Sequence, residues 1–458
     1  GPKMTARTVG VIDIGKSNAK VAVVDLDSRT EIAVRKRPNT VLRDGKYPHF
    51  DIDGLWAFAL GALRELNAEF PFDAISVTTH GASAALIAAD GTLSLPVLDY
   101  EFAGPDQYWD AYDRARPDFS ESFTPRLPGG LNVGAQLYWQ ARAFPAEFAR
   151  TRWILTYPQY WSFRLTGVVA EEITSLGCHT DLWDFTTNLY SSLVMKEGWL
   201  DRFAEVRPAS DVLGVTLPDV TAALGLKRPL PVYSGIHDSN ASLLPHLLER
   251  DPPFGLVSTG TWVIVASPGG DIDNLDLRRD CLANIDALGR PVPSARFMGG
   301  REFEMLTTPR EPPAATIERV LAETITLTPS VVQGSGPFPD RQAQWSRPRE
   351  RLDDDEVYVV TSFYLAMMTA ECLRLTGAEN HTVVEGPFAG NALYLRMLAA
   401  ATGRPVEPVK RSATGTSIGA ALLARMDRPL PDGHEAALVE GDAVAAGYAA
   451  AWRRLVGS

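Results

Sequence analysis

Two stretches of the chain, far apart in the sequence, repeat one pattern: an apolar run, a short polar turn that contains glycine, and a second apolar run. The first stretch covers residues 8–26 with its turn at 14–19, and the second covers residues 256–265 with its turn at 258–261. Two β-rich runs joined by such a turn predict a β-hairpin. Because each half of the chain contains one, we expect a duplicated architecture of two domains, residues 4–242 and 243–458, with a cleft between them.

The rest of the chain alternates between runs typical of helices and runs typical of strands, which favours an α/β layered fold. A chain of 458 residues is also longer than a domain with a single hydrophobic core usually is, which favours more than one domain. The apolar spacing predicts helices over residues 53–68, 137–148, 160–165, 356–375, 391–402 and 417–426, and strands over 74–78, 84–89, 381–385 and 405–407. We expect Asp53 to cap the first helix and Gly167 to end the third. The aromatic, charged and proline-rich segment 99–128 is expected to form an elaborated loop or lid.

Composition narrows the class of protein. The chain carries 44 Lys and Arg against 56 Asp and Glu, a formal net charge of -12, so it should repel phosphate backbones and anionic lipid. We therefore expect no nucleic-acid or membrane partner, although a few local groups could still hold a small anion. The three cysteines, Cys178, Cys281 and Cys372, are scattered and form no CxxC pair, which favours a reducing compartment and a cytoplasmic protein.

The turn of the first hairpin carries groups suited to a nucleotide phosphate and its metal. Asp13 ends the first apolar run, and Gly15, Lys16, Ser17, Asn18 and Lys20 follow it. Backbone N–H groups of such a turn can cradle phosphate oxygens while the carboxylate orients hydrated Mg²⁺. The alternative is a plain hairpin turn with a solvated Lys20. The turn is not a Walker loop, because no GxxxxGK[ST] follows a strand.

Lys16 allows two interpretations of its own. A flexible ammonium inside a phosphate turn could follow the β- and γ-phosphates as charge moves. The alternative is a solvated turn lysine.

Two segments of the second half could complete a nucleotide site. Thr259, Gly260 and Thr261 form a hydroxyl-rich turn that could hold one side of the phosphates while the first turn holds the other. Gly386, Pro387 and Asn391 lie in a glycine-bearing loop where a flat ring could approach and an amide could bond a base edge. Taken singly, both segments are also typical of ordinary turns and loops.

Asp238 follows the apolar strand at 230–233 and precedes a helix-like run. A carboxylate at such a junction can accept the proton of an attacking hydroxyl group near a helix N-terminus that favours anions. It can equally be a helix N-cap, which Asp fills very commonly.

In their order along the chain, these pieces resemble the FGGY carbohydrate kinases over about residues 8–426. Asp13 to Lys20 resembles their first phosphate motif, and Ser258 to Trp262 their second. Thr78-Thr79-His80-Gly81 resembles the segment with which the family holds the sugar. Residues 235–242 resemble the family's catalytic-aspartate segment, and residues 384–407 resemble its adenosine loop with the helix and strand that follow. Further landmarks are Arg164-Leu165-Thr166-Gly167, the segment 171–184 and the closing helix 416–424.

The resemblance implies an α/β fold of two actin-like (ribonuclease H-like) domains, with ATP, Mg²⁺ and a sugar in the cleft. It places the sugar on the 4–242 domain and the nucleotide on the 243–458 domain, with Asp238 as catalytic base and Asp13 and Asp238 at the metal. The implied sugar contacts are His80, Gly81, Asp99, Glu101, His237 and Asp238. The implied nucleotide contacts are Gly15, Lys16, Ser17, Asn18, Lys20, Thr259, Gly260, Thr261, Gly386, Pro387 and Asn391.

Three positions depart from the family pattern. Lys16 stands where the family usually has a small residue, Asp99-Tyr100-Glu101 lacks the Trp and Arg of the sugar motif, and Glu385-Gly386-Pro387 replaces a Gly-Gly pair. The Ser-x-Gly-Thr-Trp form of the second phosphate motif is most similar to the L-fuculose and L-rhamnulose kinases. His80 could also be a structural histidine.

The expected function is ATP-dependent phosphorylation of a primary hydroxyl of a small sugar, a ketose of the deoxy-ketohexose type or a pentulose. Alternatives within the class are a xylulose, ribulose or polyol kinase. Alternatives outside it are a non-catalytic sugar sensor or an actin-like assembly ATPase. The sequence leaves a homodimer open.

Overall fold

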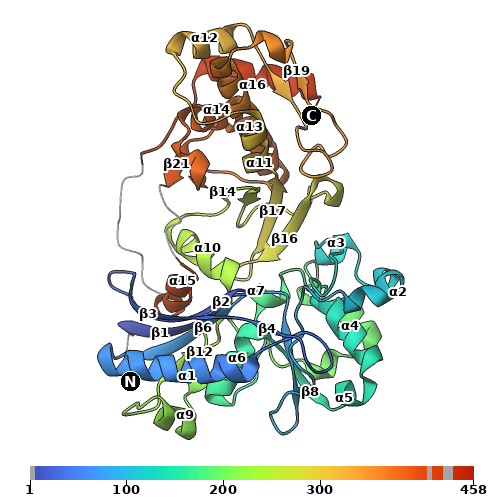
Figure 1. Cartoon of the computed structure of the whole chain (residues 1–458), viewed down its shortest axis with the longest axis vertical. Helices are drawn as coiled ribbons and strands as arrows, with labels where there is room; N and C mark the ends of the chain where they lie inside the picture. Colours follow the sequence, from blue (N-terminus) through green and yellow to red (C-terminus); the bar gives the residue numbers. More distant parts are fainter. Residues whose placement is uncertain (1–5, 410–414, 427–436, 458) are drawn as a thin grey trace. The chain divides into compact units, whose positions relative to one another are not determined.

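A computed structural model describes residues 6–409, 415–426 and 437–457 (Figure 1). The chain divides into two compact units. Unit 1 comprises Gly1–Glu249, Asn284–Arg290 and Thr414–Leu430, and unit 2 comprises Arg250–Ala283, Pro291–Ala413 and Pro431–Ser458. The prediction of a mixed α/β fold with two sheet-containing domains is confirmed. The sequence-based boundary at 242/243 falls inside helix α10 (Asp238–Glu249), and residues 4 and 5 lie outside the described residues.

The sheet of unit 1 is built around β1. Its strand order is β11-β12-β6-β1-β2-β3, and β13 also pairs with β6. The β1–β2 and β2–β3 pairs are antiparallel, whereas β6 runs parallel to β1, β12 and β13. The bounds are β1 (Thr8–Ile14), β2 (Asn18–Asp25), β3 (Thr30–Pro38), β6 (Ala74–Thr79), β11 (Val212–Val215), β12 (Pro231–Tyr233) and β13 (Ile236–His237).

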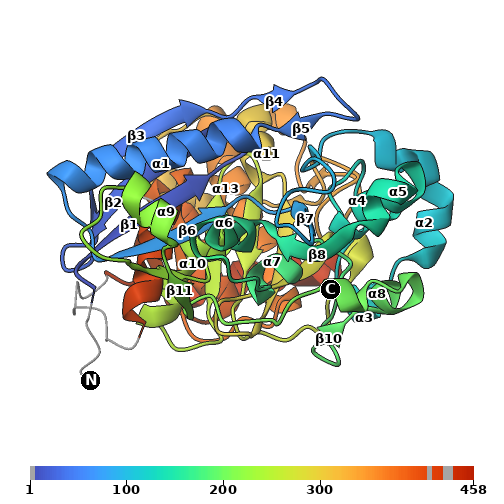
Figure 2. The same ribbon diagram turned by 90° about the horizontal axis from the view of Figure 1, so that it is seen from below.

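Helices cover both faces of this sheet. Figures 1 and 2 show α1 (Ile52–Glu69) along one face, and α6 (Tyr157–Thr166) shares the core on that face. On the opposite face α10 packs with α15 (Thr416–Leu422), which contacts β1 and β6. Ile12 and Ile14 belong to the core beneath α1 and α6. Because side chains alternate along a strand, Asp13 faces the α15 side.

Smaller elements complete unit 1. Many of them form an α-helical and hairpin region with its own aromatic core around Tyr112 and Trp139. The short strands are β4 (Val41–Leu42), β5 (His49–Phe50), β7 (Ala84–Ala88), β8 (Thr151–Thr156), β9 (Trp183–Asp184) and β10 (Leu189–Tyr190). The helices are η1 (Gly104–Tyr108), α2 (Trp109–Ala115), α3 (Phe119–Ser122), α4 (Val133–Ala143), α5 (Pro145–Ala149), α7 (Ile173–Leu176), α8 (Ser192–Glu197), η2 (Leu200–Arg202), α9 (Pro218–Ala223) and η6 (Leu423–Arg425).

The sheet of unit 2 has the same arrangement of central strands as the sheet of unit 1. Its order is β16-β17-β15-β14-β20-β21, with β14 antiparallel to β15 and parallel to β20, and β20 parallel to β21. The bounds are β14 (Gly255–Thr259), β15 (Val263–Ala266), β16 (Cys281–Ile285), β17 (Pro291–Phe297), β20 (Thr382–Glu385) and β21 (Val406–Val409), with the separate pair β18 (Leu327–Thr328) and β19 (Gln344–Trp345).

The core of unit 2 surrounds one long helix. α13 (Asp354–Leu375) begins with a capping box between Asp353 and Glu356 and is buried on almost every side, as expected for a helix that is apolar all round. The other helices are η3 (Leu277–Arg279), α11 (Gly299–Leu306), α12 (Ala314–Ala322), η4 (Arg349–Arg351), η5 (Pro387–Gly390), α14 (Ala392–Thr402) and α16 (Ala443–Val456). None of the helices described is both long and apolar enough to cross a bilayer.

Three local predictions need correction. The segment 99–128 is not only a loop, because it contains η1, α2 and α3. The cap of α1 is Asp51, whose carboxylate accepts from the Gly54 backbone N–H, and Asp53 lies inside the helix. The predicted helix 137–148 is two helices, α4 and α5, which meet at Phe144 just before Pro145. Gly167 does end α6, in the left-handed conformation that glycine favours.

Candidate active site

Three strand ends meet at one edge of the sheet in unit 1. In the parallel registers, Asp13 of β1 lies beside Thr78 of β6, and His237 of β13 lies beside Thr79. The residues that follow these strand ends, His80 and Asp238, therefore lie at the same edge. Ligands of open α/β sheets commonly bind at the carboxyl ends of parallel strands, and this edge is the candidate active site.

Asp238 is the first residue of α10 and is held by its neighbour. Its Oδ1 atom lies 3.3 Å from His237 Nε2, and its side chain is 29% exposed, so the carboxylate is positioned without being sealed from a ligand. The His237 ring is buried, with Nδ1 3.2 Å from the amide nitrogen of Asn240. Burial opposes the charged form of His237, but the charges of Cys178, Asp238 and Glu172 outweigh it and raise the pKa of His237 to about 9.

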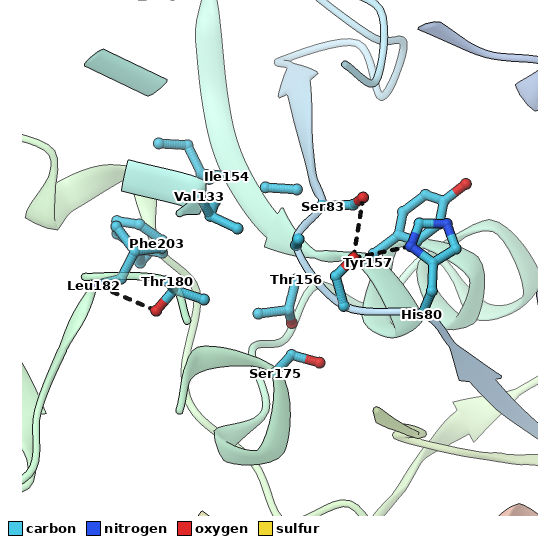
Figure 3. Close-up of a pocket in the computed structure, with 13 residues that line it drawn as sticks. His80, Ser83, Val133, Ile154, Thr156, Tyr157, Ser175, Thr180, Leu182 and Phe203 are labelled. Carbon is cyan, nitrogen blue, oxygen red and sulfur yellow. Dashed lines mark hydrogen bonds between the residues drawn. The ribbon is translucent and has the colours of Figure 1, made fainter. Parts of the chain in front are cut away.

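Gly81 allows His237 to take this position. A Cβ atom at residue 81 would lie 2.9 Å from His237 Nε2, which is closer than side-chain carbons approach one another in proteins. Figure 3 shows His80 Nδ1 and the Ser83 hydroxyl directed at one backbone oxygen, the carbonyl of Gly81. Gly81 thus fixes His80 through its carbonyl and accommodates His237 by lacking a side chain.

His80 presents an unused acceptor. Its Nδ1 atom lies 2.9 Å from the carbonyl oxygen of Gly81 and must donate to it. Burial lowers the pKa of His80 to about 4, so the ring is neutral near pH 7 and Nε2 carries a lone pair. Within the described part of the chain, that buried Nε2 atom has no hydrogen-bond partner. A buried acceptor without a donor favours a ligand hydroxyl at this point.

The cavity beside His80 is too small to be a sugar site. It is lined by residues that include Tyr157, Thr156 and Ser175 (Figure 3), and its volume is about 10 Å³. Such a volume accommodates about one water molecule. The His80 ring also contacts the rings of Phe50 and Tyr100, and the Lys16 ammonium lies over both of these rings.

Asp13 lies in a buried, polar setting. It accepts a hydrogen bond from the Thr416 hydroxyl of α15, and the Lys20 ammonium lies 3.9 Å from its Oδ2 atom and 2.9 Å from Glu31. Burial raises the pKa of Asp13 to about 6, and the charges of Asp238 and Glu31 act in the same direction. Asp13 and Asp238 are thus near enough to interact, and a divalent cation would relieve that cost.

This donor set fits Mg²⁺. Mg²⁺ is commonly held by one or two carboxylates, with water and phosphate oxygens completing its shell. Among the described residues, no group of three or more His, Cys, Asp or Glu side chains is arranged to hold a metal by itself. Asp13 and Asp238, two carboxylates at one edge of the sheet, match a Mg²⁺ site that is completed by water and phosphate oxygens.

The first turn is closed by its own glycine. The Gly15 N–H donates to the Asn18 carbonyl at 2.9 Å, and Asn39 bonds the carbonyls of Gly15 and Ser17 from outside. Ser17 and Asn18 are exposed. The Gly15 amide is therefore committed to the turn, and a phosphate contact here would use other N–H groups.

Lys16 does not extend into solvent. Its ammonium donates to Asp99 Oδ1, lies 4.0 Å from Glu101 Oε2, and stands 4.6 Å from the ring centre of Tyr100 and 5.0 Å from that of Phe50. The structure brings Lys16 together with the predicted sugar contacts Asp99 and Glu101. The phosphate contact predicted for it stays a prediction, which these bonds argue against.

The predicted nucleotide residues of unit 2 also lie together. The Thr259 hydroxyl donates to the Glu385 carbonyl at 2.7 Å and accepts from the Phe388 N–H at 3.0 Å, which joins the turn to the loop that contains Gly386 and Pro387. A Cβ atom at Gly386, where φ is 88°, would lie 2.2 Å from the Thr259 carbonyl oxygen. Gly386, Pro387, Gly260 and Thr261 are exposed.

Asn391 has a structural role. Its Oδ1 atom caps α14 by accepting from Leu393 and Tyr394, and its amide donates to the Ser362 hydroxyl. The predicted contact of the Asn391 amide with a nucleotide base stays a prediction. These hydrogen bonds argue against it, because they already occupy the side chain.

Sequence reasoning missed several partners at the edge in unit 1. Thr416, Glu31, Tyr100 and Cys178 each contact or face a predicted site residue, and the Cys178 Sγ atom lies 3.9 Å from His237 Nε2. No local motif marks them. Only the small-residue helix that begins at Thr416 offered a signal, through its resemblance to the closing helix of a kinase family.

Comparison with known proteins assigns the family. A model of the FGGY family of carbohydrate kinases, N-terminal domain, matches residues 8–245, and a model of the carbohydrate kinase FGGY C-terminal domain matches residues 251–432. The chain belongs to the FGGY family of carbohydrate kinases. The resemblance seen in the sequence motifs is confirmed.

Relatives in this family differ in their named substrates. The L-fuculokinase of Escherichia coli (strain K12) is 23% identical over 285 residues, which cover 59% of this chain and 58% of that protein. The chain thus matches less than two thirds of the length of this curated relative. A carbohydrate kinase from Novosphingobium aromaticivorans is 34% identical with a TM-score of 0.87, over 98% of this chain and 100% of that one. A xylulose kinase from Rhodospirillum rubrum, 19% identical with a TM-score of 0.76 over 98% of each chain, shares the fold.

Proposed function

We propose that the protein is a sugar kinase that transfers the γ-phosphoryl group of ATP to a primary hydroxyl of a small ketose. The observation that carries the proposal is Asp238, a partly exposed carboxylate fixed by His237 at the carboxyl end of β13. Membership of the FGGY family supports the reaction class. Similarity to an L-fuculokinase supports a deoxy-ketohexose, and a pentulose is the second candidate.

In this proposal Asp238 is the general base. The substrate oxygen attacks the γ-phosphorus, the bond from that phosphorus to the bridging oxygen breaks, ADP leaves, and the hydroxyl proton passes to Asp238. His237 holds the carboxylate in place. The neutral His80 accepts a second hydroxyl of the sugar at Nε2 and orients the substrate.

Asp13 and Asp238 would hold Mg²⁺ with the phosphates of the nucleotide. When bound, the ion neutralises charge on the phosphate oxygens. Lys20 and Thr416 keep the Asp13 carboxylate oriented. The turns at Gly15 and Gly260 and the loop at Gly386 are the proposed nucleotide contacts of this chain.

The test is an ADP-release screen with the purified full chain, MgATP and a panel of L-fuculose, L-rhamnulose, D-xylulose, L-ribulose, glycerol and D-gluconate. We expect a neutral ketose to raise ADP release well above the rate without sugar. Asp238→Asn should lower that turnover by roughly 10²- to 10⁴-fold, as for loss of a general base, while the affinity for MgADP changes less than two-fold.

Asp219→Asn is the matched control, since it makes the same chemical change at an exposed aspartate of α9. It should retain normal turnover. ATP hydrolysis that no sugar accelerates would instead identify an assembly ATPase, and sugar binding without turnover would identify a sensor. Turnover of Asp238→Asn within a few-fold of the wild-type rate would remove Asp238 from the mechanism.

A further inference from the structure

Lys16 is held firmly for a residue in an exposed turn. Its side chain is 21% exposed, whereas the Asp99 side chain to which it donates is only 5% exposed. Asp99 is itself fixed, because its Oδ1 atom also accepts from the Glu101 N–H at 3.1 Å and its own N–H donates to the Pro48 carbonyl. The position of the ammonium is therefore set by the segment 99–101, which is distant in the sequence from the phosphate turn.

The same rings that flank Lys16 also flank His80. The centroids of Phe50 and Tyr100 lie 5.1 Å and 5.5 Å from the His80 ring, and 5.0 Å and 4.6 Å from the Lys16 ammonium. The charges of Lys16 and Asp238 both act on His80. The Lys16 ammonium, which has N–H groups beyond the one bound by Asp99, and the unpartnered His80 Nε2 acceptor thus contact the same two aromatic rings. Both act electrostatically on the same neighbourhood as the candidate base, because the charges of Lys16 and Asp238 both affect His80.

The charges around this wall exclude an acidic ligand. Lys16 is faced by Asp99 and Glu101, and Asp238 lies beyond His80. The nearby Lys20 is paired with Glu31. A substrate carboxylate would therefore meet an excess of negative charge, whereas hydroxyl groups can donate to the carboxylates and accept from the ammonium.

We propose that Lys16, positioned by Asp99, is a specificity residue of the sugar site that donates to a hydroxyl of a neutral polyhydroxy substrate. This inference rests on the proposed kinase function and deepens it. It gives the turn between β1 and β2 a second role, in which one side chain turns away from the phosphates to select the acceptor.

The experiment compares Lys16→Met with Lys36→Met in the full chain. Methionine keeps the length of the side chain and removes the charge, and Lys36 is an exposed lysine on β3 that controls for the loss of one positive charge. The sugar that gives the fastest ADP release in the panel is used to measure KM for sugar and for ATP separately. Isothermal titration with MgADP measures nucleotide affinity without any sugar.

We expect Lys16→Met to raise KM for the sugar roughly 10- to 100-fold, the usual cost of losing a hydrogen bond to a charged group. The Kd for MgADP should stay within two-fold, and Lys36→Met should change neither constant. Asp99→Asn, which keeps the ammonium and weakens its anchor, should raise the same sugar constant by a smaller factor, and it serves as the test if Lys16→Met fails to fold.

Two results overturn the inference. A ten-fold weaker MgADP affinity with an unchanged sugar constant makes Lys16 a phosphate contact, and no change in either constant makes it a structural residue. If the wild-type chain phosphorylates no sugar, the proposed function fails separately. The specificity role is then decided by melting temperature: a neutral sugar of the panel must stabilise the wild type more than Lys16→Met, and equal shifts or none refute it.

Discussion

The two units begin their sheets with the same hairpin, yet the two turns are equipped in opposite ways. The turn between β1 and β2 is flanked by Asp13, Lys16 and Lys20, each in an ion pair or a hydrogen bond to another segment. The turn between β14 and β15 carries hydroxyl groups, and Thr259 uses its hydroxyl to bind the neighbouring loop.

This difference shows what a shared fold determines and what it leaves open. The order and directions of the central strands repeat between the sheets, and the glycine of each turn donates its N–H within the turn, Gly15 to Asn18 and Gly260 to Trp262. The partners of the charged residues in the first hairpin come instead from segments outside it, such as Asp99 and the Thr416 hydroxyl of α15. The duplicated backbone provides two similar edges, and the surrounding segments supply one of them with paired charged residues.

Buried acids offer the largest test of this contrast. Glu302 of unit 2 is buried and accepts from the Tyr364 hydroxyl and the Val332 N–H, and burial raises its pKa from 4.5 to about 7. Because the folded-state pKa lies above the unfolded value, the stability that this group contributes is complete at low pH and is lost as pH rises from about 4.5 to 7. Glu302→Gln should therefore be more stable than the wild type at pH 8 by up to roughly 3 kcal/mol, and similar to it at pH 4.5.

Urea unfolding of both proteins at the two pH values measures this difference. An equal difference at both values would mean that the Glu302 carboxyl group ionises without cost.

The second prediction concerns Gly81 in unit 1. In Gly81→Ala the new Cβ atom meets His237 Nε2, so the ring must move and carry Asp238 out of position. Turnover should fall on the order of 10- to 100-fold, as small displacements of catalytic groups do, with MgADP affinity unchanged. Steady-state kinetics and titration measure the two effects.

Gly61→Ala is the control for this substitution. Gly61 lies within α1 and a Cβ atom there meets nothing within 4 Å, so the variant should keep full turnover and gain up to about 1 kcal/mol of stability. Normal turnover in Gly81→Ala would show that His237 does not position the base.

The smallest predicted effect is a difference in stability between Gly→Ala substitutions in the two turns. A Cβ atom at Gly15 would lie 3.0 Å from the Asn18 carbonyl, the acceptor that closes the turn, whereas at Gly260 the nearest atom, the Trp262 carbonyl oxygen, is 3.7 Å away. Gly15→Ala should cost about 1 kcal/mol of stability, and Gly260→Ala less than about 0.5 kcal/mol. Thermal melting ranks them, and a larger loss in Gly260→Ala would mean that the second turn is the more tightly built.

The sequence allowed the backbone of the site to be predicted better than its side-chain contacts. Apolar runs that end on Asp13 and before Asp238 indicated strand ends, and these residues do lie at one edge because their strands run parallel to β6. The partner of Lys16 could not be predicted, since the direction of a long side chain depends on Asp99, 83 residues away.

Local errors had local causes. Asp51 and Asp53 are both acceptable caps, and only the backbone path decides between them. In the segment 99–128, frequent prolines and aromatic residues interrupt the apolar spacing on which helix prediction depends, so its short helices were missed.

The chain enters unit 2 after Glu249 and returns to unit 1 for α15, which packs on β1 and β6 and supplies Thr416 to Asp13. On the ribosome, domains usually fold in the order in which they emerge. Here the first unit to be synthesised is not completed first, because one face of its sheet waits for a helix encoded after most of the second unit. A nascent chain that stops before residue 416 therefore leaves part of that face uncovered and Asp13 without its hydroxyl partner, so an unfinished polypeptide lacks a complete candidate active site.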